Sequence, residues 1–162
     1  MKEIPLTRGK VAIVDDIDYE IVMRHNWHLH LSNGKEYALG TIFVKPAIYL
    51  HQFLMKPPKG MEVDHKDGDG LNCTRGNMRV CTSSQNKANK IKQSNGITSQ
   101  YKGVNWFRYD PLRYAKVGRW RMEICFEGKR ISKYFDTEIE AAKAYNKYAL
   151  ELFGEFALLN DV

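Results

Sequence analysis

The chain has 162 residues, of which 43% are hydrophobic, a size that suits one ordinary domain or two small ones. It has no apolar run as long as a membrane-spanning helix, and its first residues lack the apolar segment of a secretion signal. We therefore expect a cytoplasmic protein with no membrane partner. Its three cysteines, Cys73, Cys81 and Cys125, form no Cys-x-x-Cys pair, so we expect neither a disulfide framework nor a zinc site.

The net charge of +6 is concentrated in one part of the chain. Residues 87–133 hold 12 basic and 3 acidic side chains, giving +9, whereas residues 134–162 hold 2 basic and 6 acidic ones, giving −4. A basic band beside an acidic segment is typical of a protein that binds nucleic acid through one face. A generally basic surface would not concentrate the charge in this way.

The first 50 residues are predicted to be rich in β-structure. A helix is predicted over 19–27, with Asp16 or Asp18 as its N-cap. The sequence Ser32-Asn33-Gly34 predicts a hairpin turn after an alternating strand. The predicted strands cover residues 11–14, 28–31, 37–39 and 48–50.

A polar motif follows, beginning at Asp64-His65 after a short strand over 61–63. A loop rich in Gly and Asp leads to a second strand over 77–82, and a helix with Ser83 or Ser84 as its N-cap then carries Asn86. A hairpin packed on a helix can bring Asp64 and Asn86 together, and their oxygen atoms suit a hard cation such as Mg²⁺. His65, beside the expected metal ligand, can act as a general base. The motif predicts metal-assisted hydrolysis of a phosphodiester.

This arrangement resembles the HNH nucleases of the ββα-metal class. Asp64-His65, Asn77 and Asn86 stand where that family carries its first histidine pair, its middle asparagine and its helix ligand. The resemblance implies Mg²⁺ or Mn²⁺ on Asp64 and Asn86, without zinc, and a catalytic pair of His65 and Asn77. In this pair, a side-chain bond from Asn77 orients His65.

Two further stretches are similar to HNH proteins. Residues 49–55 resemble the strand that precedes the motif in phage and intron-encoded members, and residues 5–27 resemble a module often found ahead of it. His51 lies on that expected strand, where it either contacts a phosphate or packs beside Phe53. The loop departs from the family pattern at Cys73 and Gly76.

Residues 87–100 begin as the end of a helix and then lose periodicity, which predicts a linker over 94–100. Lys87, Lys90 and Lys92 suit a segment that lies along a phosphate backbone, although a plain solvated tether is the alternative.

The pattern changes after the linker. Strands are predicted over 101–108, 118–126 and 129–135, with apolar side chains on one face of the second strand and charged ones on the other. Thr137 and Glu140 form a capping box that begins a helix ending at Gly154. Three antiparallel strands under one helix leave a basic, aromatic outer face, which can enter a DNA major groove.

Residues 99–160 resemble the plant-type AP2/ERF DNA-binding domain. The likeness rests on stretches such as Tyr101-Lys102-Gly103-Val104, Gly118-Arg119-Trp120 and Ala157-Leu158-Leu159-Asn160. That family reads bases from its sheet. The DNA contacts expected in this chain are Lys102, Asn105, Arg108, Arg119, Arg121, Glu123, Lys129, Arg130 and Lys133, joined by Lys87, Lys90 and Lys92.

The predicted fold is α+β, with a nuclease domain over residues 1–93, its core motif over 49–90, a linker over 94–100 and an AP2-like domain over 101–162. The predicted function is a site-specific, metal-dependent homing endonuclease of phage or mobile-intron type. We expect it to nick double-stranded DNA as a monomer in a bacterial or phage-infected cell, with no small-molecule substrate. The alternatives are a non-catalytic DNA-binding regulator and a defence or restriction nuclease of relaxed specificity.

Overall fold

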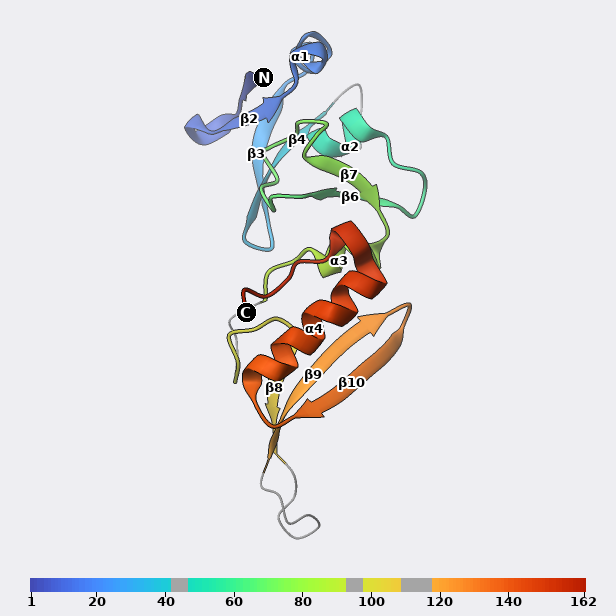
Figure 1. Ribbon diagram of the computed structural model, residues 1–162. Helices are drawn as coiled ribbons and strands as arrows, with labels where there is room; N and C mark the ends of the chain where they lie inside the picture. The colour runs from blue at the N-terminus through green and yellow to red at the C-terminus, as the bar shows by residue number, and fades with distance from the viewer. Residues whose placement is uncertain (42–46, 93–97, 109–117) are drawn as a thin grey trace. The chain divides into compact units, whose positions relative to one another are not determined.

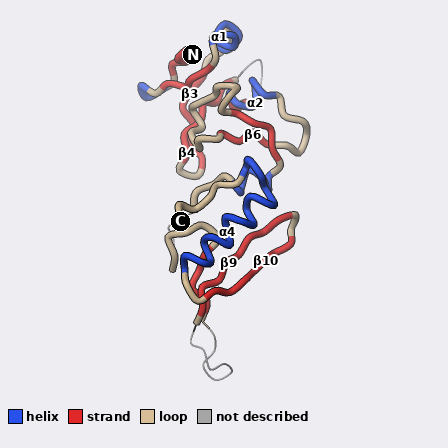
Figure 2. Tube along the Cα trace, viewed as in Figure 1, coloured by secondary structure: helices blue, strands red, loops and turns tan. Residues whose placement is uncertain are grey.

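The computed structural model describes residues 1–41, 47–92, 98–108 and 118–162. These residues form two compact units, Met1–Asn86 and Lys87–Val162 (Figure 1). Both units combine short antiparallel strands with helices (Figure 2). Residues 94–97 of the predicted linker lie outside the described part of the chain. No helix in the described ranges has the length and apolar character needed to cross a membrane.

The first unit contains three small antiparallel sheets, formed by β1–β2, by β3–β4–β5 and by β6–β7. The strands are β1 (Lys2–Pro5), β2 (Val11–Val14), β3 (Trp27–Ser32), β4 (Lys35–Gly40), β5 (Ile48–Tyr49), β6 (Glu62–His65) and β7 (Met78–Cys81). The helices are α1 (Asp16–Val22), α2 (Leu50–Met55) and α3 (Ser83–Ala88), with a short 3-10 turn, η1 (Thr7–Gly9).

The β3–β4 hairpin confirms the predicted turn. Asn33 and Gly34 both have positive φ, 51° and 75°, as a two-residue hairpin turn requires. The predicted helix over 19–27 is displaced, because α1 begins at Asp16 and ends at Val22. Trp27 opens β3 instead, and its indole nitrogen donates a 2.9 Å hydrogen bond to the Val22 carbonyl oxygen.

The strand expected over 49–55 is wrong beyond its first residue. The chain leaves β5 at Tyr49 and forms α2, which buries Leu50, His51 and Leu54 on one side. Leu50 and Leu54 are four residues apart, the spacing that places two side chains on the same face of a helix. Lys56, in the left-handed conformation with φ 46°, ends the helix.

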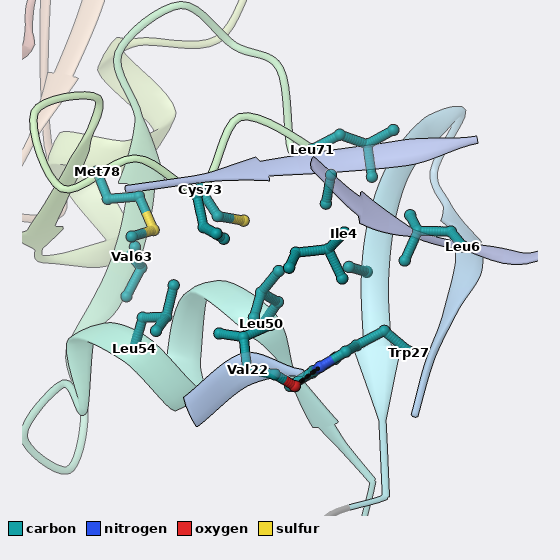
Figure 3. Packing of buried hydrophobic residues seen from close by; sticks show 13 residues of the cluster. Ile4, Leu6, Val22, Trp27, Leu50, Leu54, Val63, Leu71, Cys73 and Met78 are labelled. Atoms are coloured by element: carbon teal, nitrogen blue, oxygen red, sulfur yellow. Dashed lines mark hydrogen bonds between the residues drawn. The ribbon is translucent and has the colours of Figure 1, made fainter. Parts of the chain in front are cut away.

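One apolar core holds the first unit together. Ile4, Leu6 and Val22 from the N-terminal segment pack in the same cluster as Leu50 of α2 and Met78 of β7 (Figure 3). Residues 1–27 are therefore an integral part of the first unit and not a separate module.

The N-terminal segment also fixes the loop between β6 and β7. Ile13 of β2 exchanges 2.8 Å backbone hydrogen bonds with the loop: its nitrogen donates to Leu71, and its carbonyl accepts from Cys73. Arg75 donates at 2.8 and 2.7 Å to the two carboxylate oxygens of the buried Asp18. The loop that follows His65 is thus held by residues that lie some sixty positions earlier.

The second unit is a three-stranded antiparallel sheet packed on one long helix, as predicted. The order of the strands is β10–β9–β8. The elements are β8 (Val104–Phe107), β9 (Arg119–Phe126), β10 (Lys129–Phe135), α4 (Glu138–Phe153) and a 3-10 turn, η2 (Gly154–Phe156). The first strand is shorter than the predicted 101–108, since residues 101–103 form a turn before it.

The core of the second unit lies between the sheet and α4. Met122 and Ile124 of β9 and Val104 of β8 pack in one cluster with Ala141 and Tyr145 of α4. The predicted capping box is confirmed, because Thr137 and Glu140 bond each other reciprocally at the start of α4.

Gly103 lies close against the Tyr145 ring of α4. Its φ is +71°, and a Cβ atom there would overlap the Tyr145 ring and lie 2.9 Å from the Glu123 carbonyl oxygen. Gly128 has a similar φ of +75° but opens onto free space.

The Gly103→Ala substitution should therefore destabilise the protein by about 2–4 kcal/mol, combining backbone strain with overpacking. Gly128→Ala should cost only the backbone part, about 1 kcal/mol. Urea unfolding of both variants, monitored by tryptophan fluorescence, measures the difference. Equal losses would show that the approach of Gly103 to Tyr145 carries no energetic weight.

Candidate active site and nucleic-acid interface

The candidate active site is built on the β6–β7 hairpin and on α3. Asp64 and His65 are the last two residues of β6. The sequence predicted a strand that ends before them, at residue 63, but the strand extends through both. In the antiparallel register, Asp64 lies opposite Arg79 and His65 lies opposite Met78. Successive side chains of a strand point to opposite faces, so Asp64 and His65 serve different sides of the hairpin.

Asn77 closes the loop between the two strands. Its amide nitrogen donates to the Asp67 carboxylate and to the Asn72 carbonyl oxygen, both at 2.9 Å, and its side-chain oxygen accepts from the Asp67 backbone at 3.1 Å. Its own carbonyl accepts from the Lys66 backbone at 2.9 Å. These loop bonds set where the chain leaves His65, while the bond from Asn77 to His65 that the family resemblance implied stays a prediction.

Asp64 forms an ion pair that the sequence analysis missed. Arg79 Nε and Nη2 lie 2.9 and 2.8 Å from Asp64 Oδ2, and the two side chains are 11% and 6% exposed. Removing two charges from water is costly unless they neutralise each other at close range. The pair therefore holds the Asp64 carboxylate in place against a positive charge.

Asn86 is oriented by a second acidic residue. Its amide nitrogen donates a 2.6 Å hydrogen bond to Glu62 Oε2, which leaves the amide oxygen as its acceptor for another partner. Helix α3 begins at Ser83, so neither Ser83 nor Ser84 is the N-cap. Thr82 has that role. Its hydroxyl accepts a 3.2 Å hydrogen bond from the Gln85 backbone nitrogen, and the Gln85 side-chain oxygen accepts a 2.8 Å bond from the Thr82 backbone nitrogen.

The donor atoms fit a hard divalent cation. A carboxylate and an amide oxygen are the ligands that Mg²⁺ and Mn²⁺ accept. Within the described residues, no group of three or more His, Cys, Asp or Glu side chains could hold a metal by itself. A cation at Asp64 and Asn86 would thus rely on water or phosphate oxygens to complete its coordination.

His65 is a buried and neutral imidazole. Burial lowers its pKa below the usual value, while the nearby carboxylates of Asp67, Asp64 and Asp69 act in the opposite direction. Its Nε2 atom lies 3.9 Å from the thiol sulfur of Cys73. A neutral ring can accept a proton, which is the property that a general base needs.

His51, from α2, packs against His65. The His51 and His65 rings are 5.1 Å apart and nearly perpendicular, at 88°, and Tyr49 stacks on the His51 ring with centres 5.3 Å apart. His51 is 8% exposed, and its Nδ1 atom has no hydrogen-bond partner among the described residues. Burial, with a smaller contribution from His65, lowers the pKa of His51 to about 3. The structure places His51 beside His65, a contact that neither interpretation of His51 from the sequence anticipated.

The sequence analysis missed two residues of the site, Arg79 and Glu62, and the contact of His51 with His65. The alternation of side chains along a strand was the available signal for the two residues. Glu62 and Asp64 are two positions apart on β6 and so share one face, and Arg79 lies opposite Asp64 on β7. Only the register shows that they share one face.

The outer face of the second unit carries the residues expected to contact DNA. Asn105, Arg121 and Tyr134 lie opposite one another across the three strands. The Arg121 guanidinium lies 5.2 Å from the centre of the Phe107 ring, and the Phe107 and Tyr134 rings are 5.4 Å apart. This stacking holds a planar donor group in place on an aromatic surface.

Charged partners further fix this face. Glu123 lies 3.4 Å from Arg121 and 3.7 Å from Arg130, while Arg119 pairs with Asp136 at 3.1 Å. The buried Nε atoms of Arg119 and Arg121 have no hydrogen-bond partner in the described part of the chain. The arginines are therefore positioned and retain hydrogen-bonding capacity.

Three lysines expected on DNA point elsewhere in the structure. Lys133 lies on the helix side of the sheet, with Nζ 5.1 Å from the Tyr148 ring centre. Lys102 donates to the Ala88 carbonyl oxygen, and burial lowers its pKa to about 8. Lys92 was expected in a segment without fixed geometry, yet its Nζ donates at 2.7–2.9 Å to the carbonyl oxygens of Ser99, Tyr101 and Val104.

The remaining predicted contacts include exposed residues. Lys87, Lys90, Lys129 and Arg130 are exposed, and their charges face solvent. Lys129 is four residues before Lys133 on β10, so both positions lie on the face of the sheet that α4 covers. Arg108 follows the end of β8.

Comparison with known proteins agrees with this geometry. The family described as HNH endonuclease matches residues 56–88, which span β6, the loop, β7 and α3. An uncharacterized HNH endonuclease, L560, of Acanthamoeba polyphaga mimivirus is 35% identical over 156 residues, covering 96% of this chain and 77% of the relative. Protein 3.8 of Escherichia phage T7 is 32% identical over 100 residues, covering 62% of this chain and 76% of the relative. No solved structure matches.

The chain therefore belongs to the HNH endonuclease family, whose members hydrolyse phosphodiester bonds of DNA and generally use a divalent metal ion. The predicted enzyme class is confirmed, and so is the mixed α+β fold.

The buried His51 should make stability depend on pH. The unfolded chain takes up a proton at His51 near pH 6.5, whereas the folded protein excludes it down to about pH 3. The free energy of unfolding should therefore be fully retained above pH 6.5 and fall as the pH drops below it, by up to about 1.4 kcal/mol per pH unit from this residue. His65 contributes in the same direction.

The His51→Phe variant keeps an aromatic ring and should lose this part of the pH dependence. Urea unfolding between about pH 7 and pH 5 measures the slope, and His28→Phe, at an exposed strand position, serves as the matched control. An unchanged slope in His51→Phe would contradict a neutral, buried imidazole.

Proposed function

We propose that this HNH endonuclease is a site-specific nuclease of the homing type, which nicks double-stranded DNA with His65 as general base and Mg²⁺ or Mn²⁺ on Asp64 and Asn86. The observation that carries the proposal is the hairpin and helix of residues 62–88, in which a buried, neutral histidine directly follows a carboxylate fixed by an ion pair. Asn86, bonded to Glu62, supplies the second oxygen ligand.

The chemistry follows from the state of each side chain. His65, neutral and buried, takes a proton from water, and the resulting hydroxide attacks the scissile phosphate. Asp64 and Asn86 would hold a divalent ion, which would supply electrostatic stabilisation of the negative charge that develops during hydrolysis. Asn77 acts on His65 through the loop that it closes, by fixing the chain immediately after the base.

Sequence choice is assigned to the outer face of the second unit. The resemblance to AP2/ERF domains and the partly exposed, positioned arginines of this face both support the assignment. Arg119 and Arg121 can bond guanine edges, and Glu123 can accept from a cytosine amino group. Asn105 and Arg130 complete the reading face, while the exposed Lys87 and Lys90 suit phosphate contacts. Lys92, Lys102 and Lys133 are left out because their ammonium groups have partners inside the unit.

One set of site residues per chain supports nicking of a single strand by a monomer. A reading face attached to a nuclease unit supports cleavage at one extended site and not at many. A non-catalytic regulator would have no need for the oriented Asp64, His65 and Asn86, and a defence nuclease would cut broadly.

The first test separates catalysis from binding. His65→Ala should lower the nicking rate at least ~100-fold while leaving DNA affinity nearly unchanged, because the base lies outside the reading face. Asp64→Ala and Asn86→Ala should weaken the dependence of the rate on Mg²⁺ or Mn²⁺. The assay is nicking of a supercoiled plasmid library, sequenced at the ends. Nicking by His65→Ala at the wild-type rate would remove His65 from the mechanism, and cuts scattered over the library would favour the defence nuclease.

The second test concerns sequence choice. Arg121→Ala should cost ~1–3 kcal/mol on the cognate site and relax preference at one base position. Lys133→Ala is the matched control, since it removes an equal charge from the opposite face of the same sheet. Affinities for single-base site variants at several salt concentrations measure both. A uniform loss of affinity in Arg121→Ala would reduce its role to a phosphate contact.

A further inference from the structure

Arg79 brings a positive charge to the carboxylate that would hold the divalent ion. The two side chains lie opposite each other across the β6–β7 hairpin, joined by bonds of 2.9 and 2.8 Å that both end on Asp64 Oδ2. At 6% and 11% exposure, neither charge is well hydrated. A buried carboxylate remains ionised only when a cation neutralises it.

The surroundings of this pair are acidic. Glu62 and Cys81 are cross-strand partners, and they occupy the same face of the hairpin as Asp64 and Arg79. Burial, followed by the charges of Asp64 and Glu62, raises the pKa of Cys81 to about 11. Two carboxylates and one guanidinium leave a single net negative charge on this face, so Arg79 reduces the negative potential that an incoming divalent ion meets.

We propose that Arg79 is the resident counter-ion of Asp64 and a positioning residue that sets the affinity of the nuclease centre for its divalent ion. This inference rests on the proposed function, in which Asp64 is a metal ligand. In the ion-free protein the guanidinium holds the carboxylate in place. An ion that binds Asp64 must share the carboxylate with Arg79 or displace it, and two cations at one carboxylate weaken each other.

The experiment uses Mn²⁺ as the probe and the full chain without DNA. Free Mn²⁺ is measured by electron paramagnetic resonance, and melting temperature is measured in EDTA and in Mn²⁺. Arg79→Met removes the charge and keeps an unbranched side chain of similar reach. It should bind Mn²⁺ roughly tenfold or more tightly than wild type. Its melting temperature in EDTA should fall, and Mn²⁺ should restore more of it than in wild type.

Two further variants keep the test decisive if Arg79→Met folds poorly. Asp64→Asn with Arg79→Met removes both charges and should melt higher in EDTA than Arg79→Met alone, since no uncompensated carboxylate remains. Arg79→Lys keeps the charge and should bind Mn²⁺ within a few-fold of wild type. Unchanged Mn²⁺ affinity in Arg79→Met, or a double variant no more stable than Arg79→Met, would overturn the inference.

The Asp64→Asn variant separates the role of Asp64 as a metal ligand from the role of Arg79 as its counter-ion. It should lose Mn²⁺ binding by the same assay. Retained binding in Asp64→Asn would refute the proposed metal ligand itself. Lost binding in Asp64→Asn, together with no gain in Arg79→Met, would refute only the role of Arg79.

Discussion

The antiparallel register of β6 and β7 is the constraint on which the rest of the nuclease unit depends. It sets Arg79 against Asp64 and directs His65 to the opposite side of the hairpin. Asn77 maintains this register by tying both ends of the loop, and Ile13 and Asp18 hold the loop from outside. A one-residue slip would move every side chain of the hairpin to the wrong face.

Burial explains the electrostatic character of the site. A histidine removed from water disfavours its charged form, so both His51 and His65 have lowered pKa values. Asp64 is just as buried and lies within hydrogen-bond distance of the Arg79 guanidinium. The same low exposure therefore gives neutral imidazoles and a carboxylate paired with a cation within one unit.

In the second unit, the alternation of side chains along each strand decides where the positive charges lie. One set of alternate residues packs on α4, where Met122 and Val104 form the core, and the other set forms the outer face of the sheet. Lys133 belongs to the first set despite its charge, with its stem and ammonium against Tyr148. Lys92 shows a different use of charge, since its ammonium donates to the backbone carbonyl oxygens of Ser99, Tyr101 and Val104. Net charge therefore overstates the number of lysines available to a nucleic acid.

The sequence by itself determined the elements that local rules govern. The Asn33-Gly34 turn, the Thr137–Glu140 capping box and the alternation along β9 follow from interactions within a few residues, and all three are present. The identities of Asp64, His65, Asn77 and Asn86 likewise came from spacing and chemistry within one short motif.

Only the tertiary structure decided which partners those residues have. The pairings of Asp64 with Arg79 and of Asn86 with Glu62 join positions 15 and 24 residues apart, and the contact of His51 with His65 depends on how α2 packs on β6. The folding of residues 50–55 as a helix has the same origin, because an apolar run of this length suits a strand or a helix equally until a core selects one face. Register and burial are properties of the whole chain, and they set the charge and orientation of each group in the site.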